Sequence, residues 1–392
     1  MLYYQPFPLT MAQGRGARLR DIDGHEYLDC VGEFSAGLYG HDEPEILGAI
    51  REVLNRGLVL AAPTDLEARM AALLQQRFPS LERLRFCNSG TEANLFAIAT
   101  AIAVTGRRKV MVFRHAYHGG VLVFGDASLP MNVPHDFVMA DYNDAEGARR
   151  IIEEQGGELA AVIVEPILGA GGNIPGAPGF LKALREATQR TGTILIFDEV
   201  KTSRCGPGGV QQLMGIRPDL TTMGKYVGGG LPCGVFGGRA DLMDRFDPAR
   251  PDALKHAGTF NNNVCTLAAG LAGLSRVFTP ERAADFFSRS EDFRLSMNRE
   301  FRERNLPMQC VGLGSMFSLH FTADPVNAPA DIPAHSRLLG QLFHMHSLLK
   351  GVLVCARGDL FLSLPMTDAD LQKVREVMLD FAASYPDVLT AG

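Results

Sequence analysis

The middle of the chain alternates between short apolar runs and longer stretches in which apolar positions recur every three or four residues. The short runs cover 109–113, 160–164 and 193–197, and the amphipathic stretches cover 144–155 and 180–191. Runs this short and this apolar suit strands buried on both faces, and the stretches between them suit helices. Such alternation is typical of a mostly parallel sheet covered on both sides. The pattern therefore predicts an α/β fold.

The first part of the chain has a different pattern. Residues 17–29 alternate between apolar and polar positions around the pair Asp23-Gly24, as the two strands of a hairpin do. Residues 43–56 then place apolar side chains at helical spacing. We expect turn-rich strands followed by a helix in this part.

The last part also combines helices and strands. An apolar helix precedes a long amphipathic helix over 283–305, and alternating positions predict strands over 316–321 and 360–364. Thr367 is the expected cap of a closing helix. Residues 325–333 form the only long loop that the pattern predicts.

Composition narrows the class of protein. The 392 residues include 46% hydrophobic and 21% charged residues and 42 glycines, which suits a compact α/β enzyme rather than a collagenous, coiled-coil or disordered chain. The net charge is −6, and the charged residues are spread along the chain rather than gathered in blocks. Because the sequence has no basic stripe, we expect no nucleic-acid partner.

The cysteines and the N-terminal sequence indicate the cellular compartment of the protein. The seven cysteines are widely separated, without a C-x-x-C pair or a Cys/His cluster at metal-ligand spacing. The first residues lack a basic segment followed by an apolar one, and the apolar runs elsewhere are shorter than a membrane span. We therefore expect reduced thiols, no metal site, no membrane and a cytoplasmic protein.

Residues 88–93, Asn-Ser-Gly-Thr-Glu-Ala, form a first candidate site. They follow a short strand and open an apolar helix. The backbone N–H groups and hydroxyls of Ser89, Gly90 and Thr91 would lie at the positive end of that helix, which binds phosphate. The alternative is an ordinary helix start, capped by Ser89 with Glu92 completing a capping box.

A carboxylate is expected at the end of a buried strand. Asp198 follows the apolar run 193–197, at the carboxyl end of a strand, where open α/β sheets bind their ligands. Because an unpaired buried charge is costly, it needs a cationic partner, such as a protonated pyridine nitrogen. The alternative is a structural aspartate paired to a backbone amide or to Arg204. The neighbouring Glu199 faces the other way and is assigned to structure.

A lysine lies in the glycine-rich segment 222–230. Gly224 and the glycines at 228–230 let a bulky ligand approach the backbone, and Lys225 between them can hold a carbonyl cofactor as a Schiff base. The segment is not a phosphate loop of the Walker type, because Tyr226 replaces the required hydroxyl residue. A solvated lysine is the alternative.

An aromatic residue follows another strand. Tyr117 and His118 come after the run that ends at Phe113, and an aromatic ring at this edge of a sheet can lie flat on a heteroaromatic cofactor. The alternatives are a core position for Tyr117 and a loop hydrogen bond for His118.

Six motifs follow one another along nearly the whole chain: Asn88-Ser-Gly-Thr-Glu-Ala93, Ala116-Tyr-His-Gly119, Glu165-Pro166, Phe197-Asp-Glu-Val200, Gly224-Lys225 and Gly258-Thr-Phe260. In this order they resemble those of the class III aminotransferases, which are fold-type I enzymes that depend on pyridoxal phosphate. Within that family the sequence is most similar to the β-amino acid (β-phenylalanine) aminotransferases and to the glutamate-1-semialdehyde aminomutase branch.

The resemblance implies a domain organisation. A large domain, residues 46–280, would contain a mostly parallel seven-stranded sheet covered by helices. A smaller α+β domain would be built from residues 1–45 and 281–392.

The resemblance also implies roles for the matching residues. Lys225 would hold pyridoxal 5'-phosphate as a Schiff base, Asp198 would pair with its ring nitrogen, and Tyr117 would stack on the ring. Arg357 would bind a substrate carboxylate, and its alternative is a surface arginine at the start of a strand. The other cofactor contacts would come from Ser89, Gly90, Thr91, His118, Glu165 and, from the second subunit of a homodimer with shared active sites, Thr259.

Similar β-amino acid aminotransferases carry an arginine for the substrate carboxylate in an N-terminal extension, and this sequence begins just after that point. A second cation is then expected elsewhere. We hypothesise that Arg114 or Lys201, both in loops next to the implied cofactor, contributes to substrate recognition.

The implied reaction moves an amino group from an aromatic β-amino acid or a related amine to a 2-keto acid such as 2-oxoglutarate or pyruvate. One alternative is an intramolecular aminomutase of the glutamate-1-semialdehyde type, which uses the same residues and needs no separate keto acid. Another is a non-catalytic binding module with the same fold. Intact Lys225 and Asp198 argue against the binding module, which has no chemical need for either residue.

Overall fold

The computed structural model describes residues 8–390, which divide into two compact units. The large unit comprises Glu45–Gly171 and Gly176–Ala283. The small unit comprises the chain up to Pro44, the chain from Ala284 and the segment Gly172–Pro175. It is therefore assembled from both ends of the chain and from a short middle segment that the sequence did not indicate.

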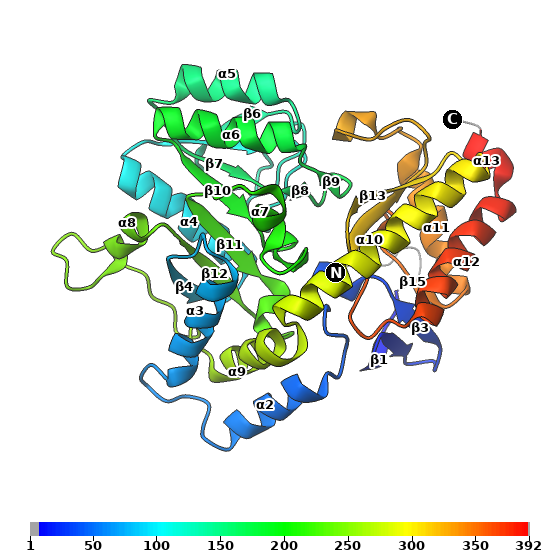
Figure 1. Cartoon of the computed structure of the whole chain (residues 1–392), viewed down its shortest axis with the longest axis horizontal. Helices are drawn as coiled ribbons and strands as arrows, with labels where there is room; N and C mark the ends of the chain where they lie inside the picture. The colour runs from blue at the N-terminus through cyan, green and yellow to red at the C-terminus, as the bar shows by residue number, and fades with distance from the viewer. Residues whose placement is uncertain (1–7, 391–392) are drawn as a thin grey trace. The chain divides into compact units, whose positions relative to one another are not determined.

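A seven-stranded sheet forms the centre of the large unit (Figure 1). Its strands are β4 (Arg83–Cys87), β5 (Lys109–Phe113), β6 (Asp136–Ala140), β7 (Leu159–Val164), β10 (Ile194–Asp198), β11 (Leu220–Gly224) and β12 (Gly234–Gly238). Their spatial order is β4-β12-β11-β10-β7-β5-β6. Only the two pairs that involve β12 are antiparallel, so every strand of this sheet except β12 runs in one direction.

Helices cover the sheet because each connection between parallel strands must cross one of its faces. Helix α4 (Gly90–Thr105) packs on β12, β11, β10 and β7, while α5 (Ala145–Gln155) and α6 (Pro178–Thr191) lie side by side (Figure 1). The other elements of this unit are α2 (Pro44–Leu54), α3 (Asp65–Arg77), β8 (Ile167–Leu168), η1 (Thr202–Arg204), α7 (Gly209–Met214), η2 (Lys225–Gly228), α8 (Ala240–Met243), η3 (Asp244–Phe246), α9 (Val264–Ala272) and the π-helical turn η4 (Gly273–Val277).

The central strands are buried at every position, as continuous apolar runs require. All residues of β7 and β10 are buried. The prediction of an α/β fold with a mostly parallel seven-stranded sheet is thereby confirmed. The prediction of 325–333 as the only long loop is wrong, because residues 114–135 and 247–263 also lack helices and named strands.

The sheet brings the ends of several strands to one edge. Because β4, β5, β7, β10 and β11 run in the same direction, their carboxyl ends meet there. The residues that end or follow these strands therefore gather at a single edge, among them Ser89, Tyr117, Glu165, Asp198 and Lys225.

The small unit contains two small sheets and several helices. The first sheet has the order β1-β2-β3-β15, in which β15 runs parallel to β3, and the second is the antiparallel sheet β13-β14-β16. The rings of Phe321, Phe343 and Phe381 contribute to its core, with centroids 5.3 to 6.4 Å apart. The elements are β1 (Met11–Arg15), β2 (Arg18–Asp21), β3 (Glu26–Asp29), α1 (Gly32–Ser35), β9 (Ile174–Pro175), α10 (Pro280–Glu303), β13 (Gln309–Leu313), β14 (Met316–His320), η5 (Pro329–Asp331), α11 (Ser336–Leu349), β15 (Val352–Leu353), β16 (Asp359–Phe361), α12 (Asp368–Ser384) and α13 (Pro386–Thr390).

The short α1 is left-handed. Glu33, Phe34 and Ser35 have φ values of +47°, +53° and +85°, a region that costs an L-residue roughly 1 to 2 kcal/mol. The carboxylate of Asp29 supports the turn by accepting hydrogen bonds from the backbone N–H groups of Val31 at 2.8 Å and of the following glycine at 3.0 Å. Local sequence preference does not predict such a turn.

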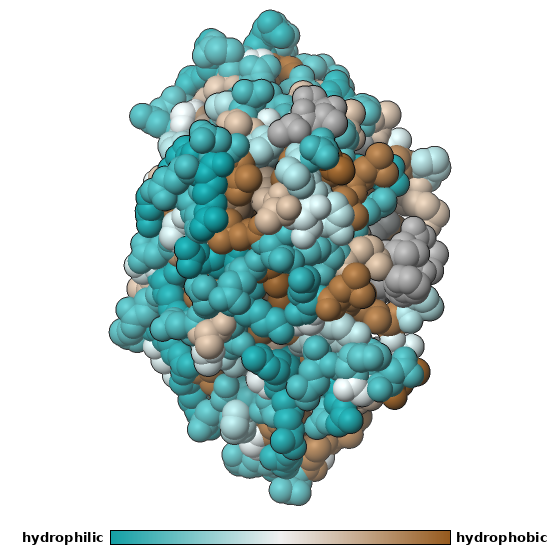
Figure 2. All heavy atoms as spheres, turned by 90° about the vertical axis from the view of Figure 1, so that its right-hand side faces the viewer, coloured by the Kyte–Doolittle hydropathy of each residue, from teal (hydrophilic) through white to brown (hydrophobic). Residues whose placement is uncertain are grey.

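The face in Figure 2 is mostly hydrophilic, and its hydrophobic residues form small, separate groups. Single exposed apolar residues are normal on a protein surface. Within residues 8–390, no helix combines the length and the apolar character that crossing a membrane requires.

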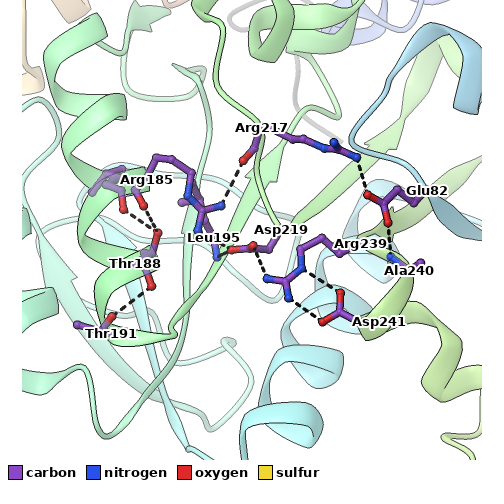
Figure 3. Close-up of polar contacts among 11 residues, drawn as sticks. Glu82, Arg185, Thr188, Thr191, Leu195, Arg217, Asp219, Arg239, Ala240 and Asp241 are labelled. Carbon is purple, nitrogen blue, oxygen red and sulfur yellow. Dashed lines mark hydrogen bonds and ion pairs between the residues drawn. The ribbon is translucent and has the colours of Figure 1, made fainter.

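A buried carboxylate holds the sheet together at the edge opposite the strands' carboxyl ends (Figure 3). Asp219, just before β11, accepts hydrogen bonds from the backbone N–H of Leu195 at 2.8 Å and from Arg185 of α6 at 2.9 Å. Its other oxygen accepts a bond from Arg239, after β12, also at 2.9 Å. One side chain with 7% of its surface exposed therefore links a helix and three strands.

We expect Asp219→Asn to lower the free energy of unfolding by about 3 kcal/mol, because one partner of a buried ion pair is removed. The thermal midpoint should fall by several degrees. Asp241→Asn is the control, since Asp241 also pairs with Arg239 but is 62% exposed; its effect should stay below about 1 kcal/mol. Equal midpoints for the two variants in calorimetry would contradict the central role of Asp219.

Candidate active site

The carboxylate of Asp198 is the centre of the site. It ends β10 and is 4% exposed. One oxygen, Oδ2, accepts hydrogen bonds from Asn94 Nδ2 at 2.7 Å and from His118 Nδ1 at 2.8 Å. The other, Oδ1, accepts a bond from the backbone N–H of Val200 at 3.0 Å. These three donors fix the orientation of the carboxylate.

Two of these donors are themselves fixed. Asn94 of α4 also donates to the backbone oxygen of His118 at 2.9 Å and accepts a bond from Thr222 of β11 at 2.6 Å. The His118 side chain is fully buried, and among the described residues its Nε2 has no hydrogen-bond partner. Because a carboxylate can only accept, we assign a proton to Nδ1, where it bonds to Asp198.

Lys225 follows β11 with an unusual backbone conformation. Its φ of +55° is in the left-handed region, and such strain persists only where the surrounding structure holds it. A Cβ on the preceding Gly224 would lie 3.0 Å from the carbonyl oxygen of Cys233 and 3.4 Å from the nitrogen of Gly90. The absence of a side chain at Gly224 thus lets β11 end against the first turn of α4.

The start of α4 is capped and tightly enclosed. Ser89 Oγ accepts a hydrogen bond from the backbone N–H of Glu92 at 3.1 Å, so the capping interpretation of this residue is correct. The Glu92 carboxylate bonds to the backbone N–H of Asn88 at 2.9 Å, rather than to that of Ser89 as a capping box requires. A Cβ on Gly90 would lie 2.7 Å from Val200, so only glycine fits at that position.

The loop after β5 closes over the same helix end. Gly119 has a φ of +129°, and a Cβ on it would lie 2.3 Å from Thr91 Oγ1. Tyr117, two residues earlier, is 48% exposed, which leaves part of its ring accessible to a ligand. The core position for Tyr117 is therefore incorrect.

A second buried carboxylate connects three loops at this edge. Glu165 accepts hydrogen bonds from the backbone N–H groups of Tyr117 and Gly169, both at 2.9 Å. Burial raises the pKa of Glu165 above its usual value, while the charges of His118 and Lys201 act in the opposite direction. Glycine at 169 leaves room for Lys201, whose Nζ would lie 2.6 Å from an added Cβ.

The other residues singled out by the sequence lie elsewhere. The guanidinium of Arg114 donates to Asp141 at 2.8 Å and to the backbone oxygen of Asp126 at 3.0 Å. Glu199 accepts bonds from Thr202 and from the start of α7, so it fixes the local backbone. Thr259 lies in an exposed loop of the large unit, and Arg357 belongs to the small unit.

Comparison with known proteins identifies the family. The family model "Aminotransferase class-III" matches residues 3–380 of this chain. The chain belongs to the class III aminotransferases. The family depends on pyridoxal phosphate, and so does this aminotransferase. Solved relatives include a transaminase with this cofactor bound. The match to that structure covers 100% of this chain at a TM-score of 0.88.

Individual relatives cover almost the whole aminotransferase. The chain is 50% identical over 389 residues to the β-phenylalanine transaminase of Variovorax paradoxus, covering 99% of this chain and 89% of that protein. The crystal structure of a β-phenylalanine aminotransferase from the same organism superimposes with a TM-score of 0.96 at 48% identity, over 98% of this chain and 90% of that one. A glutamate-1-semialdehyde 2,1-aminomutase of Brevibacillus brevis is 37% identical over 386 residues, covering 94% and 90%.

The geometry of this aminotransferase fits pyridoxal phosphate. The cofactor needs donors for a phosphate, a carboxylate for a ring nitrogen and an amine for its carbonyl carbon. The start of α4 presents backbone N–H groups and the hydroxyls of Ser89 and Thr91. Asp198 offers a fixed, buried carboxylate, and Lys225 offers the amine, both at the same edge of the sheet.

Two functional side chains of the aminotransferase were missed in the sequence. Asn94 and Thr222 form the hydrogen-bonded chain that ends at Asp198, and each is buried. The available signal was a polar residue on an otherwise apolar helix or strand, since such a residue must find a partner inside the fold. The partner itself could not be read from the sequence, because 128 positions separate these two residues.

We expect His118→Phe to weaken binding of pyridoxal phosphate about tenfold, because Asp198 loses one charge-assisted hydrogen bond. Phenylalanine preserves the aromatic shape of the buried side chain. Equilibrium dialysis of the apoprotein against the cofactor measures the change. His25→Phe is the matched control, since His25 is a 70% exposed residue of the small unit that also bonds to an aspartate. Unchanged affinity in His118→Phe would show that its bond to Asp198 does not matter for the cofactor.

Proposed function

We propose that this aminotransferase moves an amino group from an aromatic β-amino acid resembling β-phenylalanine to a 2-keto acid such as 2-oxoglutarate or pyruvate. The observation that carries the proposal is 50% identity, over 99% of the chain, to the β-phenylalanine transaminase of Variovorax paradoxus. Because one fold can host different functions, the shared fold does not by itself settle the substrate. The substrate is therefore what the experiments below must test.

In this proposal Lys225 and Asp198 are the catalytic residues. When bound, pyridoxal phosphate supplies a ring that accepts electrons from the reacting bond. The amine of Lys225 would hold the cofactor and, once free, would accept the proton that leaves the substrate carbon. The carboxylate of Asp198, oriented by Asn94 and His118, would keep the ring nitrogen protonated.

The proposed cofactor contacts come from the edge of the large unit. The start of α4, with Ser89, Gly90 and Thr91, binds the phosphate. Tyr117 stacks on the ring with its exposed face, and Glu165 fixes the Tyr117 backbone through the bond at 2.9 Å. His118 acts on the cofactor through Asp198 rather than by direct contact.

Two cations are proposed for substrate carboxylates. Arg357 of the small unit is the first, in keeping with its 46% exposed guanidinium. For the second we propose Lys201 rather than Arg114, because Lys201 lies beside Glu165 and Gly169. The guanidinium of Arg114 is instead bonded to Asp141 and to the backbone oxygen of Asp126.

We expect Lys201→Ala to raise the half-saturating concentration of β-phenylalanine several-fold, because the substrate carboxylate loses a contact with a positive charge. Arg114→Ala is the control and should leave that concentration unchanged. Stopped-flow measurement of the donor half-reaction provides both values. If neither variant changes, both residues are excluded as carboxylate contacts.

We propose a homodimer in which Thr259 reaches the phosphate of the other subunit. Thr259 is exposed and is followed by Phe260, whose ring is 62% exposed. A monomeric holoenzyme in sedimentation velocity would contradict the proposal.

We propose a cytoplasmic location, with a small-molecule amine and a keto acid as the only partners besides the second subunit. The seven cysteines are free thiols, which suits a reducing compartment. Recovery of the native protein from a cell-envelope fraction would contradict this location.

The aminomutase remains the second candidate because a glutamate-1-semialdehyde 2,1-aminomutase is 37% identical over 386 residues. The two reactions differ in their need for an acceptor. A transaminase turns over only when a separate keto acid is supplied, and a mutase needs none. The higher identity to the β-phenylalanine transaminase favours the first reaction.

The decisive experiment follows the absorption of the holoenzyme after β-phenylalanine is added without a keto acid. We expect the visible band of the bound cofactor to be replaced by a near-ultraviolet band, and 2-oxoglutarate or pyruvate to restore it. Lys225→Ala is the control and should not convert.

The other outcomes assign the function differently. A holoenzyme whose band ignores β-phenylalanine but responds to glutamate-1-semialdehyde is an aminomutase. A holoenzyme whose band responds to no amine would favour the non-catalytic binding module.

A further inference from the structure

Thr259 lies at the tip of a tight turn in the large unit. The backbone N–H of Asn261 donates a hydrogen bond to the carbonyl oxygen of Gly258 at 3.2 Å, so Thr259 and Phe260 are the two central residues of this turn. Both are exposed. The loop 247–263 that carries the turn has no helix or named strand of its own. The tip therefore keeps one position only if the base of the turn is held.

The side chain of Asn261 holds that base on the segment that precedes α4. Its Oδ1 accepts a hydrogen bond from Asn88 Nδ2 at 3.0 Å. The same amide lies against Gly258, since a Cβ on this glycine would be 2.3 Å from Oδ1 and 2.7 Å from Nδ2 of Asn261. A side chain at position 258 would displace the amide. One asparagine thus contacts both the turn and Asn88.

Asn88 is also fixed by a second group. Its backbone N–H and its Nδ2 donate to one oxygen of Glu92, at 2.9 Å and 3.3 Å. Asn88 directly precedes Ser89, which caps α4 and belongs to the proposed phosphate site. The bond between Asn88 and Asn261 therefore joins a supported helix start to the exposed turn that carries Thr259.

We infer that Asn261 is a positioning residue for the cofactor phosphate of the other subunit, because it fixes the turn of its own subunit on Asn88 and so keeps Thr259 in place. The inference rests on the proposed homodimer, in which Thr259 reaches that phosphate. A hydroxyl that is already in position loses less conformational entropy when it binds. Asn261 acts through Thr259 and does not itself touch the phosphate.

The test uses mixed dimers in which only one site can be labelled. Two full-length chains with different affinity tags are co-expressed, and dimers that carry both tags are isolated. The silent subunit carries Lys225→Ala, and the reporting subunit keeps Lys225. After equilibration with pyridoxal phosphate, borohydride fixes the cofactor covalently on Lys225 of the reporting subunit. Mass spectrometry then gives the labelled fraction of that subunit at each cofactor concentration, without any measurement of activity.

The expected effect depends on which subunit carries the substitution. Asn261→Ala on the silent subunit should weaken cofactor binding at the reporting site about tenfold, because the Thr259 that serves this site is no longer held. Asn88→Ala on the silent subunit should have a similar effect, since it removes the other partner of the same bond. Asn261→Ala on the reporting subunit should change the affinity by less than about twofold, because Glu92 still holds Asn88 there.

Two further variants separate positioning from folding. Thr259→Ala on the silent subunit sets the largest effect, and adding Asn261→Ala to it should cause no further loss, because Asn261 acts through Thr259. Asn298→Ala is the control for general destabilisation. Asn298 bonds to the backbone of Cys310 in the small unit at 2.7 Å and 3.0 Å. Its loss from the silent subunit should lower the thermal midpoint without changing the affinity at the reporting site.

Several results would overturn the inference. It is wrong if Asn261→Ala acts equally from both subunits, acts only from the reporting subunit, or has no effect while Thr259→Ala on the silent subunit does. If Thr259→Ala on the silent subunit is also without effect, the proposed role of Thr259 is wrong as well. Chains that form no mixed dimers contradict the proposed homodimer, and an unlabelled wild-type chain contradicts the proposed role of Lys225. Both of these outcomes are visible before Asn261 is changed.

Discussion

The burial of one carboxylate at the end of a parallel strand constrains the rest of the site. A buried carboxylate needs hydrogen-bond donors, and Asp198 receives them from Asn94, His118 and the Val200 backbone. Those donors come from α4, from the loop after β5 and from the turn after β10. Each of these segments must therefore lie at the same edge of the sheet. The helix start, the aromatic loop and the lysine segment share this edge for the same reason.

Close backbone approach is the second condition for the site. Gly90, Gly119 and Gly224 leave no room for a Cβ against Val200, Thr91 and the backbone of Cys233 respectively. The left-handed conformation of Lys225 adds strain at the same place. At the opposite edge of the sheet, hydrogen bonds to Asp219 hold α6, β10 and β12 together. A rigid sheet held at both edges keeps the catalytic groups in fixed positions.

Buried aspartates serve three different purposes in this chain. Asp219 holds secondary-structure elements together, Asp198 is oriented toward a ligand, and Asp359 bonds to an arginine that is half exposed. The chemistry of each is the same carboxylate with three or more donors. The donors differ: Asp219 is bonded by a backbone N–H and two arginines, Asp198 by an amide, an imidazole and a backbone N–H, and Asp359 by a hydroxyl, an amide and a guanidinium.

The sequence by itself determined the α/β class, the strands with continuous apolar runs and the motifs that identify the family, because hydrophobic period and glycine placement are local properties. It also indicated Asp198 and Lys225, since a charge at the end of an apolar strand and a lysine between glycines are locally unusual. Only the tertiary structure decided the partners of Asp198, the bond between Asp359 and Arg357, the middle segment of the small unit and the left-handed turn at Glu33–Ser35. Those features depend on contacts between residues far apart in the chain or on strain that the surrounding fold must hold, and no local pattern encodes either.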